Sequence, residues 1–212
     1  MKKGIIFDLD GTLWDATEQM LPAWNKVLLR YAPDREPMTL EEVRSFMGKT
    51  VAEIAAAALP NFPEEERVEV FNRCSIEELP WLREHPGSIY PKVPEILYLL
   101  SKEYPLYIVS NCQAGYIEAF LKVTNLGKYV TDFENPGRTG KPKADNIRLV
   151  IERNNLDKAF YVGDTQGDYD ATMAAGIPFI FAAYGFGNID GDEEEIQGLN
   201  ELPDLIDKLV EK

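Results

Sequence analysis

Four short apolar runs constrain the fold most strongly. They are rich in β-branched and aromatic residues and are too short for helices, so we predict that each forms a buried strand. The runs are Gly4–Asp8 (GIIFD), Pro105–Ser110 (PLYIVS), Lys158–Gly163 (KAFYVG) and Pro178–Ala182 (PFIFA).

Segments with helical spacing separate these runs. They lie at Val93–Leu100, at Ala144–Arg153 and at Ala171–Ala175, which ends at Gly176. Strands that alternate with helices predict an α/β fold, a Rossmann-like parallel sheet covered on both faces. In such sheets ligands bind at the carboxyl ends of the strands, so we expect the functional residues there.

Residues 16–85 differ from the rest of the chain. Apolar side chains recur there at helical spacing in three stretches, and no convincing strand interrupts them. We therefore predict a helical cap domain inserted after the first strand. The expected boundaries are a Rossmann-like core at 1–14 and 86–212 and a cap at 15–85.

Charge and composition narrow the classes of partner. The net charge of −14 offers no basic face to nucleic acid or to an anionic membrane, so we expect neither as a partner. The chain contains no run of about 18 apolar residues, so we expect no membrane-spanning helix. Two cysteines give no disulfide framework, which indicates a soluble, cytoplasmic protein. We expect the acidic run Asp190–Glu195 (DGDEEE) to be a surface loop.

Four aspartates follow predicted strands. Asp8 and Asp10 leave the first strand on the same side, Asp164 ends the FYVGD run, and Asp168 comes four residues later. Carboxylates gathered at neighbouring strand ends repel one another unless a cation lies among them. Oxygen ligands suit Mg²⁺, so the pattern predicts a magnesium site built from these residues.

Other polar residues near the strand ends suit an anion. Gly11 lets backbone N–H groups approach a phosphate, and Ser110 and Asn111 offer a hydroxyl and an amide. Lys141, in GKPKADN, is our candidate for the positive charge that offsets the phosphate. Lys143 competes for that role, and position along the chain does not choose between the two.

Four ordered motifs resemble those of the haloacid dehalogenase-like superfamily. They are DLDGT at 8–12, SN at 110–111, GKP at 140–142 and GDTQGD at 163–168. The resemblance covers essentially the whole chain and implies a phosphatase with a small helical cap, similar to phosphoglycolate phosphatases. It implies a small phosphorylated metabolite as the substrate and Mg²⁺ as the cofactor.

The resemblance also implies a role for each residue of the motifs. Asp8 would be the nucleophile that forms an aspartyl-phosphate, and Asp10 the general acid and base. Ser110 and Lys141 would bind the phosphoryl oxygens. The metal ligands would be Asp8, the backbone carbonyl of Asp10 and Asp164, while Asp168 would orient the waters of the metal or Lys141, or ligate the metal in some states.

Alternative activities share parts of this pattern. Dehalogenases and phosphonate hydrolases of the superfamily lack a carboxylate at the position of Asp10. Sugar-phosphate mutases keep all four motifs but carry a cap histidine soon after the first, whereas the single histidine here is His85. A non-catalytic phospho-accepting regulatory protein also uses acidic residues, Mg²⁺ and a lysine, but has no helical cap.

The segment around Gly48 resembles the substrate-specificity loop of the family. A glycine there lets the cap close over the core. Arg44 or Lys49 would meet an anionic group of the substrate, or both are ordinary surface charges; Glu18 would face the site or the solvent. Because the cap covers the site, a small phosphomonoester fits better than a polymer.

Overall fold

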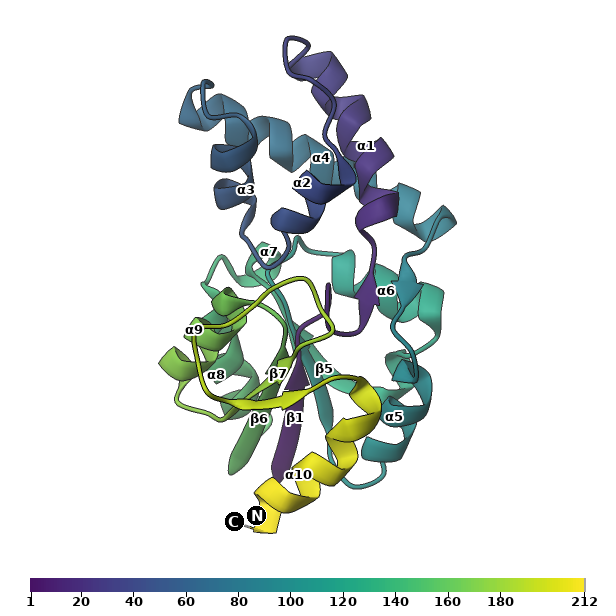
Figure 1. Cartoon of the computed structure of the whole chain (residues 1–212), viewed down its shortest axis with the longest axis vertical. Coiled ribbons are helices and arrows are strands. Elements are labelled where there is room, and N and C mark those ends of the chain that lie inside the picture. The colour runs from purple at the N-terminus through teal and green to yellow at the C-terminus, as the bar shows by residue number, and fades with distance from the viewer. Residues whose placement is uncertain (212) are drawn as a thin grey trace.

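The computed structural model describes residues 1–211 and contains a six-stranded parallel sheet in the order β5-β4-β1-β6-β7-β8 (Figure 1). Its strands are β1 (Lys3–Phe7), β4 (Leu106–Val109), β5 (Val130–Glu134), β6 (Lys158–Gly163), β7 (Phe179–Ala182) and β8 (Glu194–Ile196). β1 is paired on both sides, and its Ile5 lies opposite Leu106 and Phe160. The predicted α/β fold with a Rossmann-like sheet is confirmed.

The four predicted strands are all present, and the sheet has two more. β5 was not predicted, and β8 begins inside the acidic run that we expected to be a surface loop. That expectation is wrong for Glu194 and Glu195, which pair with β7. β8 is the edge strand, so its backbone hydrogen bonds hold it in place while these two side chains stay exposed.

Helices cover both faces of the sheet. Alternate residues of β1 point to opposite faces, since Ile6 belongs to one apolar cluster and Ile5 and Phe7 to another. The first face is covered by α8 (Lys143–Arg153) and α9 (Gln166–Ala175). The second is covered by α5 (Val93–Leu100), α6 (Tyr116–Thr124) and α10 (Leu202–Glu211). Short helices at α7 (Pro136–Thr139), Gly127–Tyr129 and Leu199–Glu201 complete the connections.

Four helices lie between the first strand and the rest of the sheet. We call them the helical insert; they are α1 (Thr17–Tyr31), α2 (Leu40–Ser45), α3 (Val51–Ala58) and α4 (Glu64–Glu84). A two-stranded ribbon joins the two ends of the insert, β2 (Trp14–Asp15) pairing with β3 (Ser88–Ile89). Figure 1 shows the insert above the carboxyl ends of the strands. The division into a core and a cap domain stays a prediction.

The helices of the structure are too short or too polar to span a membrane within the part of the chain described. Within residues 1–211, no helix has both the length and the apolar character needed to cross a bilayer. The longest helix, α4, carries three glutamates in its first turn and buries only part of its surface.

Candidate active site

Three buried carboxylates meet at the carboxyl ends of β1 and β6. Asp8, Asp164 and Asp168 each offer an oxygen, and these oxygens lie within 4.8 Å of one another. All three side chains are nearly inaccessible to solvent. The backbone fixes Asp8 directly, because its N–H donates to the carbonyl of Val162 on β6 at 2.8 Å.

The start of α9 places Asp168. Thr165 caps this helix, since its hydroxyl accepts from the Asp168 N–H at 3.2 Å and its own N–H donates to Asp168 Oδ2 at 3.0 Å. The Thr165 hydroxyl and the Asp164 N–H also donate to Oδ2, at 2.8 and 3.1 Å. The carboxylate is therefore held by one oxygen while Oδ1 turns toward Asp8 and Lys143.

Gly11 makes room for Asp164. It adopts a φ of +90°, and a Cβ at this position would lie 2.1 Å from Asp164 Oδ2. Thr12 Oγ1 and the Phe186 N–H then hydrogen-bond to the two oxygens of Asp164, at 3.1 and 2.8 Å. Gly11 thus permits the loop to wrap around a carboxylate; its predicted contact with phosphate stays a prediction.

The lysine that faces the carboxylates is Lys143. Its Nζ donates to Asp8 Oδ1 at 2.6 Å and also to Asp168 Oδ1, and its side chain is buried. Our expectation that the amine of Lys141 would face the carboxylates is wrong, because Lys141 is exposed. Lys143, the other lysine considered from the sequence, therefore occupies the position facing the carboxylates.

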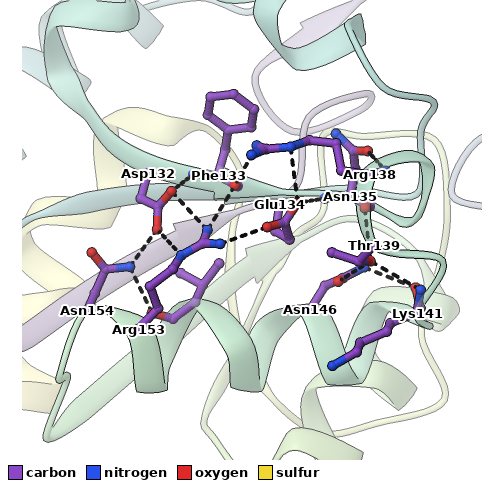
Figure 2. A network of polar contacts seen from close by, with 11 residues as sticks. Asp132, Phe133, Glu134, Asn135, Arg138, Thr139, Lys141, Asn146, Arg153 and Asn154 are labelled. Carbon is purple, nitrogen blue, oxygen red and sulfur yellow. Dashed lines mark hydrogen bonds and ion pairs between the residues drawn. The ribbon is translucent and has the colours of Figure 1, made fainter.

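The polar network of Figure 2 explains which lysine enters the site. The contacts of Lys141 drawn there are made by its backbone: its N–H donates to Thr139 Oγ1 at 3.1 Å, and its carbonyl accepts from Asn146 Nδ2 at 3.1 Å. Lys141 is thereby fixed in the connection before α8, whereas Lys143 is the first residue of the helix. At the other end, Arg153 binds Asp132 and Glu134 of β5 at 2.9 Å and anchors α8 to the sheet.

The charges of the cluster do not balance. Burial and the neighbouring Asp168 raise the pKa of Asp8 to about 6, although Lys143 and the Ser110 hydroxyl favour its charged form. Burial, Asp168 and Asp8 also raise the pKa of Asp164. Burial alone would lower the pKa of Lys143, but Asp168 and Asp8 outweigh burial and raise it. One lysine therefore faces three carboxylates, which leaves two negative charges in excess when all are ionised.

This donor set fits a divalent cation. Three carboxylates provide only oxygen ligands, and the excess of two negative charges equals the charge of Mg²⁺. The carboxylate of Asp10 lies outside the group of three, so the predicted contribution of Asp10 through its backbone carbonyl stays a prediction.

Asp10 has a different partner, which the sequence did not reveal. The hydroxyl of Tyr116, in the first turn of α6, donates to Asp10 Oδ1 at 2.8 Å, and both side chains are buried. Burial raises the pKa of Asp10, and the hydrogen bond from Tyr116 offsets part of this effect. Asp10 is thus placed in surroundings that favour a protonated carboxyl group.

Ser110 and Asn111 follow β4, next to β1. Ser110 is buried beside Asp8, and its hydroxyl lowers the pKa of that carboxyl. The amide of Asn111 instead reaches the insert, where Nδ2 donates to the carbonyl of Gly48 at 2.9 Å. The predicted roles of Ser110 and Asn111 in phosphate binding stay predictions.

Of the residues expected to select the substrate, Gly48 contacts the core, whereas Arg44 and Lys49 are exposed. Gly48 has a φ of +79°, and a Cβ there would lie 2.8 Å from Thr165 Oγ1, so this loop touches the core. Arg44 is exposed and pairs with Asp15 at 3.4 Å, while the amine of Lys49, also exposed, donates to the carbonyl of Ser45. Glu18 is exposed as well. Contacts of these side chains with substrate stay a prediction.

A cavity of about 50 Å³ joins the two parts of the molecule. It is lined by Asp8, Asp10 and Ser110 on the sheet side and by mostly apolar side chains of the insert. The insert also contributes Glu78 of α4, a buried carboxylate that no sequence pattern singled out. By its volume the cavity holds about four water molecules.

Known proteins are similar to this chain in sequence and in fold. The model of the haloacid dehalogenase-like hydrolases matches residues 5–182. The phosphoglycolate phosphatase of Aquifex aeolicus is 31% identical over 192 residues, which cover 86% of this chain and 85% of that protein. A pyrophosphatase of Listeria welshimeri is 30% identical and covers 82% of each.

Solved structures agree on the fold. A haloacid dehalogenase-like hydrolase from Streptococcus pneumoniae superimposes with a TM-score of 0.80 at 21% identity, over 97% of this chain and 98% of that one. Because the family model spans most of the chain and the relatives cover most of its length, the chain belongs to the haloacid dehalogenase-like hydrolases.

Proposed function

We propose that this hydrolase is a Mg²⁺-dependent phosphatase that hydrolyses a small phosphomonoester through an aspartyl-phosphate. One observation carries the proposal: Asp8 is held by Lys143 within a cluster of buried carboxylates, and a second buried acid, Asp10, follows two residues later. A relative named a phosphoglycolate phosphatase supports a small phosphomonoester as the substrate, and one named a pyrophosphatase supports hydrolysis of a small phosphate compound more generally.

In the first half of the reaction, Asp8 is the nucleophile. An oxygen of its carboxylate attacks the phosphorus, and the bond between phosphorus and the leaving oxygen breaks. Asp10, whose pKa is raised by burial, gives its proton to that oxygen. Lys143 holds Asp8 in place and offsets the charge of the phosphoryl oxygens, while Ser110 lies beside them as a donor.

In the second half, Asp10 acts as the base. It takes a proton from water, the water oxygen attacks the phosphorus, and the bond between phosphorus and Asp8 breaks. Phosphate leaves, and Asp8 and Asp10 return to their starting states. Asp8, Asp164 and Asp168, with the backbone carbonyl of Asp10, would hold Mg²⁺, which supplies positive charge for the transferred phosphoryl group.

The surroundings favour hydrolysis of a small ester. The insert covers the carboxyl ends of the strands, and the cavity that Asp8 and Asp10 line has a volume of about 50 Å³, which suits a small metabolite better than a polymer. A mutase of this type would carry a cap histidine soon after the first motif, whereas the single histidine of this chain, His85, stacks on Trp81 with ring centroids 3.8 Å apart and is absent from the cavity lining. Residues 15–85 would act as the cap.

The test combines metal removal with two substitutions. We expect phosphate release from an aryl phosphate only with Mg²⁺, and a fall of at least about 10³-fold for both Asp8→Asn and Asp10→Asn. Only Asp10→Asn should retain labelled phosphate on the protein, because it keeps the nucleophile. Full activity in excess EDTA would refute the metal requirement, and label on the Asp8→Asn protein would refute the role of Asp8.

A further inference from the structure

We propose that Glu78 selects the substrate: it disfavours a leaving group with a second anionic group and favours one with hydroxyl or amino donors. This inference rests on the proposed function, because it concerns the leaving-group side of the same site.

Glu78 is buried in the wall of the cavity. It lies on α4, is 2% exposed, and lines the cavity together with Asp8 and Asp10. Apart from Glu78, Lys49 and Ser75, the side chains that the insert contributes to this wall are apolar, or absent in the case of Gly48. A substrate enclosed here would therefore meet Glu78 with little water between them.

The partners of Glu78 are neutral. Trp24 Nε1 donates to Oε2 at 2.5 Å, and Gln113 Nε2 donates to Oε1. The cation of the insert in the cavity wall is Lys49, whose side chain is exposed and whose amine is bound to Ser45. Two hydrogen bonds stabilise the carboxylate of Glu78 but do not cancel its charge.

Glu78 lies in the same part of the cavity as Asp10, the acid proposed to protonate the leaving group. Gln113, which binds Glu78, and Tyr116, which binds Asp10, belong to the same short segment after β4. Asp10, Gln113, Tyr116 and Glu78 all line the same cavity. A leaving group that takes its proton from Asp10 is therefore released toward Glu78.

Like charges enclosed together in a small cavity with mostly apolar walls repel strongly, whereas a carboxylate accepts hydrogen bonds from hydroxyl and amino groups. Phosphoglycolate and pyrophosphate, the compounds in the names of two relatives, both carry a second anion. We expect this chain to hydrolyse them less well than esters of polyols or of amino alcohols.

The experiment compares the full chain with Glu78→Gln and, as a matched control, Glu77→Gln. Glu77 lies on the same helix, pairs with Lys26 and is absent from the cavity wall. Each protein is assayed with Mg²⁺ at pH 8 on phosphoglycolate, pyrophosphate, glycerol phosphate, phosphoethanolamine and an aryl phosphate. The value compared is the ratio of kcat/KM between substrates, which does not depend on the fraction of active protein.

We expect the unsubstituted protein to prefer glycerol phosphate and phosphoethanolamine to phosphoglycolate by at least tenfold. Glu78→Gln should reduce this preference to threefold or less, and Glu77→Gln should retain it. A native preference for phosphoglycolate or pyrophosphate overturns the proposal without any variant, even if Glu78→Gln does not fold. An unchanged ratio in Glu78→Gln also overturns it. If the aryl phosphate is hydrolysed in those cases, the proposed function stands; if no ester is hydrolysed, both fail.

Discussion

The clustered acids at the ends of the strands and the buried Glu78 of the insert are stabilised in different ways. On the sheet, Lys143 binds Asp8 and Asp168, and the three clustered carboxylates fit a divalent cation. On the insert, the donors that bind Glu78 within residues 1–211 are the neutral groups of Trp24 and Gln113. Under the proposed function, the positive charge of Lys143 beside the clustered acids favours an anionic phosphate, whereas Glu78, once ionised, presents a negative charge to the leaving group. The proposal thus assigns the chemistry to the sheet and the recognition of the leaving group to the insert.

Removal of Lys143 should have the largest effect. Lys143→Ala leaves Asp8 and Asp168 buried without their cation, so we expect a loss of about 3 kcal/mol or more in the free energy of unfolding. The activity should fall by at least about 10²-fold. Urea unfolding and phosphate release measure the two effects.

Lys141→Ala is the matched control for Lys143→Ala. Its side chain is exposed, so we expect a change within about 0.5 kcal/mol and activity close to that of the unsubstituted protein. A larger loss from Lys141→Ala than from Lys143→Ala would return Lys141 to the role that the motif suggested.

Glu78→Gln should have an intermediate effect that depends on pH. Burial raises the pKa of Glu78 from 4.5 to about 7 despite its two hydrogen bonds. Below pH 4.5 both folded and unfolded chains keep the proton. As the pH rises, the unfolded chain releases it first, so the native carboxyl increasingly destabilises the fold until the pH exceeds 7.

The neutral amide of Glu78→Gln removes this cost. The free energy of unfolding of the variant, relative to the unsubstituted protein, should rise by on the order of 2 kcal/mol between pH 5 and pH 8. Denaturant unfolding at the two pH values measures it, and Glu77→Gln should show a much smaller change. If the free energy of unfolding of Glu78→Gln relative to the unsubstituted protein were the same at both pH values, Glu78 would be ionised at both. The surroundings of Glu78 would then differ less from those of the acids on the sheet than described.

Tyr116→Phe should have the smallest effect. It removes one hydrogen bond from Asp10, worth about 1 kcal/mol, so we expect kcat to fall by about fivefold. Because Tyr116 lowers the pKa of Asp10, its loss should also move the pH profile of kcat to higher pH. A fall in kcat with an unmoved profile would assign Tyr116 to packing alone.

The interior of the sheet could be predicted from the sequence because its strands are buried on both faces. β1, β4, β6 and β7 are continuous apolar runs for this reason. β5 was missed because Asp132 and Glu134 interrupt its apolar pattern. Their charges are matched by Arg153 of α8, a contact between residues about 20 positions apart that no local pattern reveals.

The candidate site was predictable to a similar extent. The aspartates were found because strand ends and a helix cap fix their places in the chain. The choice between Lys141 and Lys143 depends on where α8 begins, which Thr139 and Asn146 decide through contacts with the backbone. Tyr116 and Glu78 were missed because their partners, Asp10 and Gln113, are distant in sequence and carry no shared spacing.

The segment after β4 holds the sheet and the insert together. Asn111, the residue after Ser110, donates to the carbonyl of Gly48. Gln113, two residues further along, donates to the carboxylate of Glu78. The bond to Gly48 joins two neutral groups and contributes about 1 kcal/mol, whereas the bond from Gln113 ends on a carboxylate and is stronger when that group is ionised. Two side chains of one short segment therefore tie the insert to the sheet, so a substitution at either position should loosen the attachment of the insert.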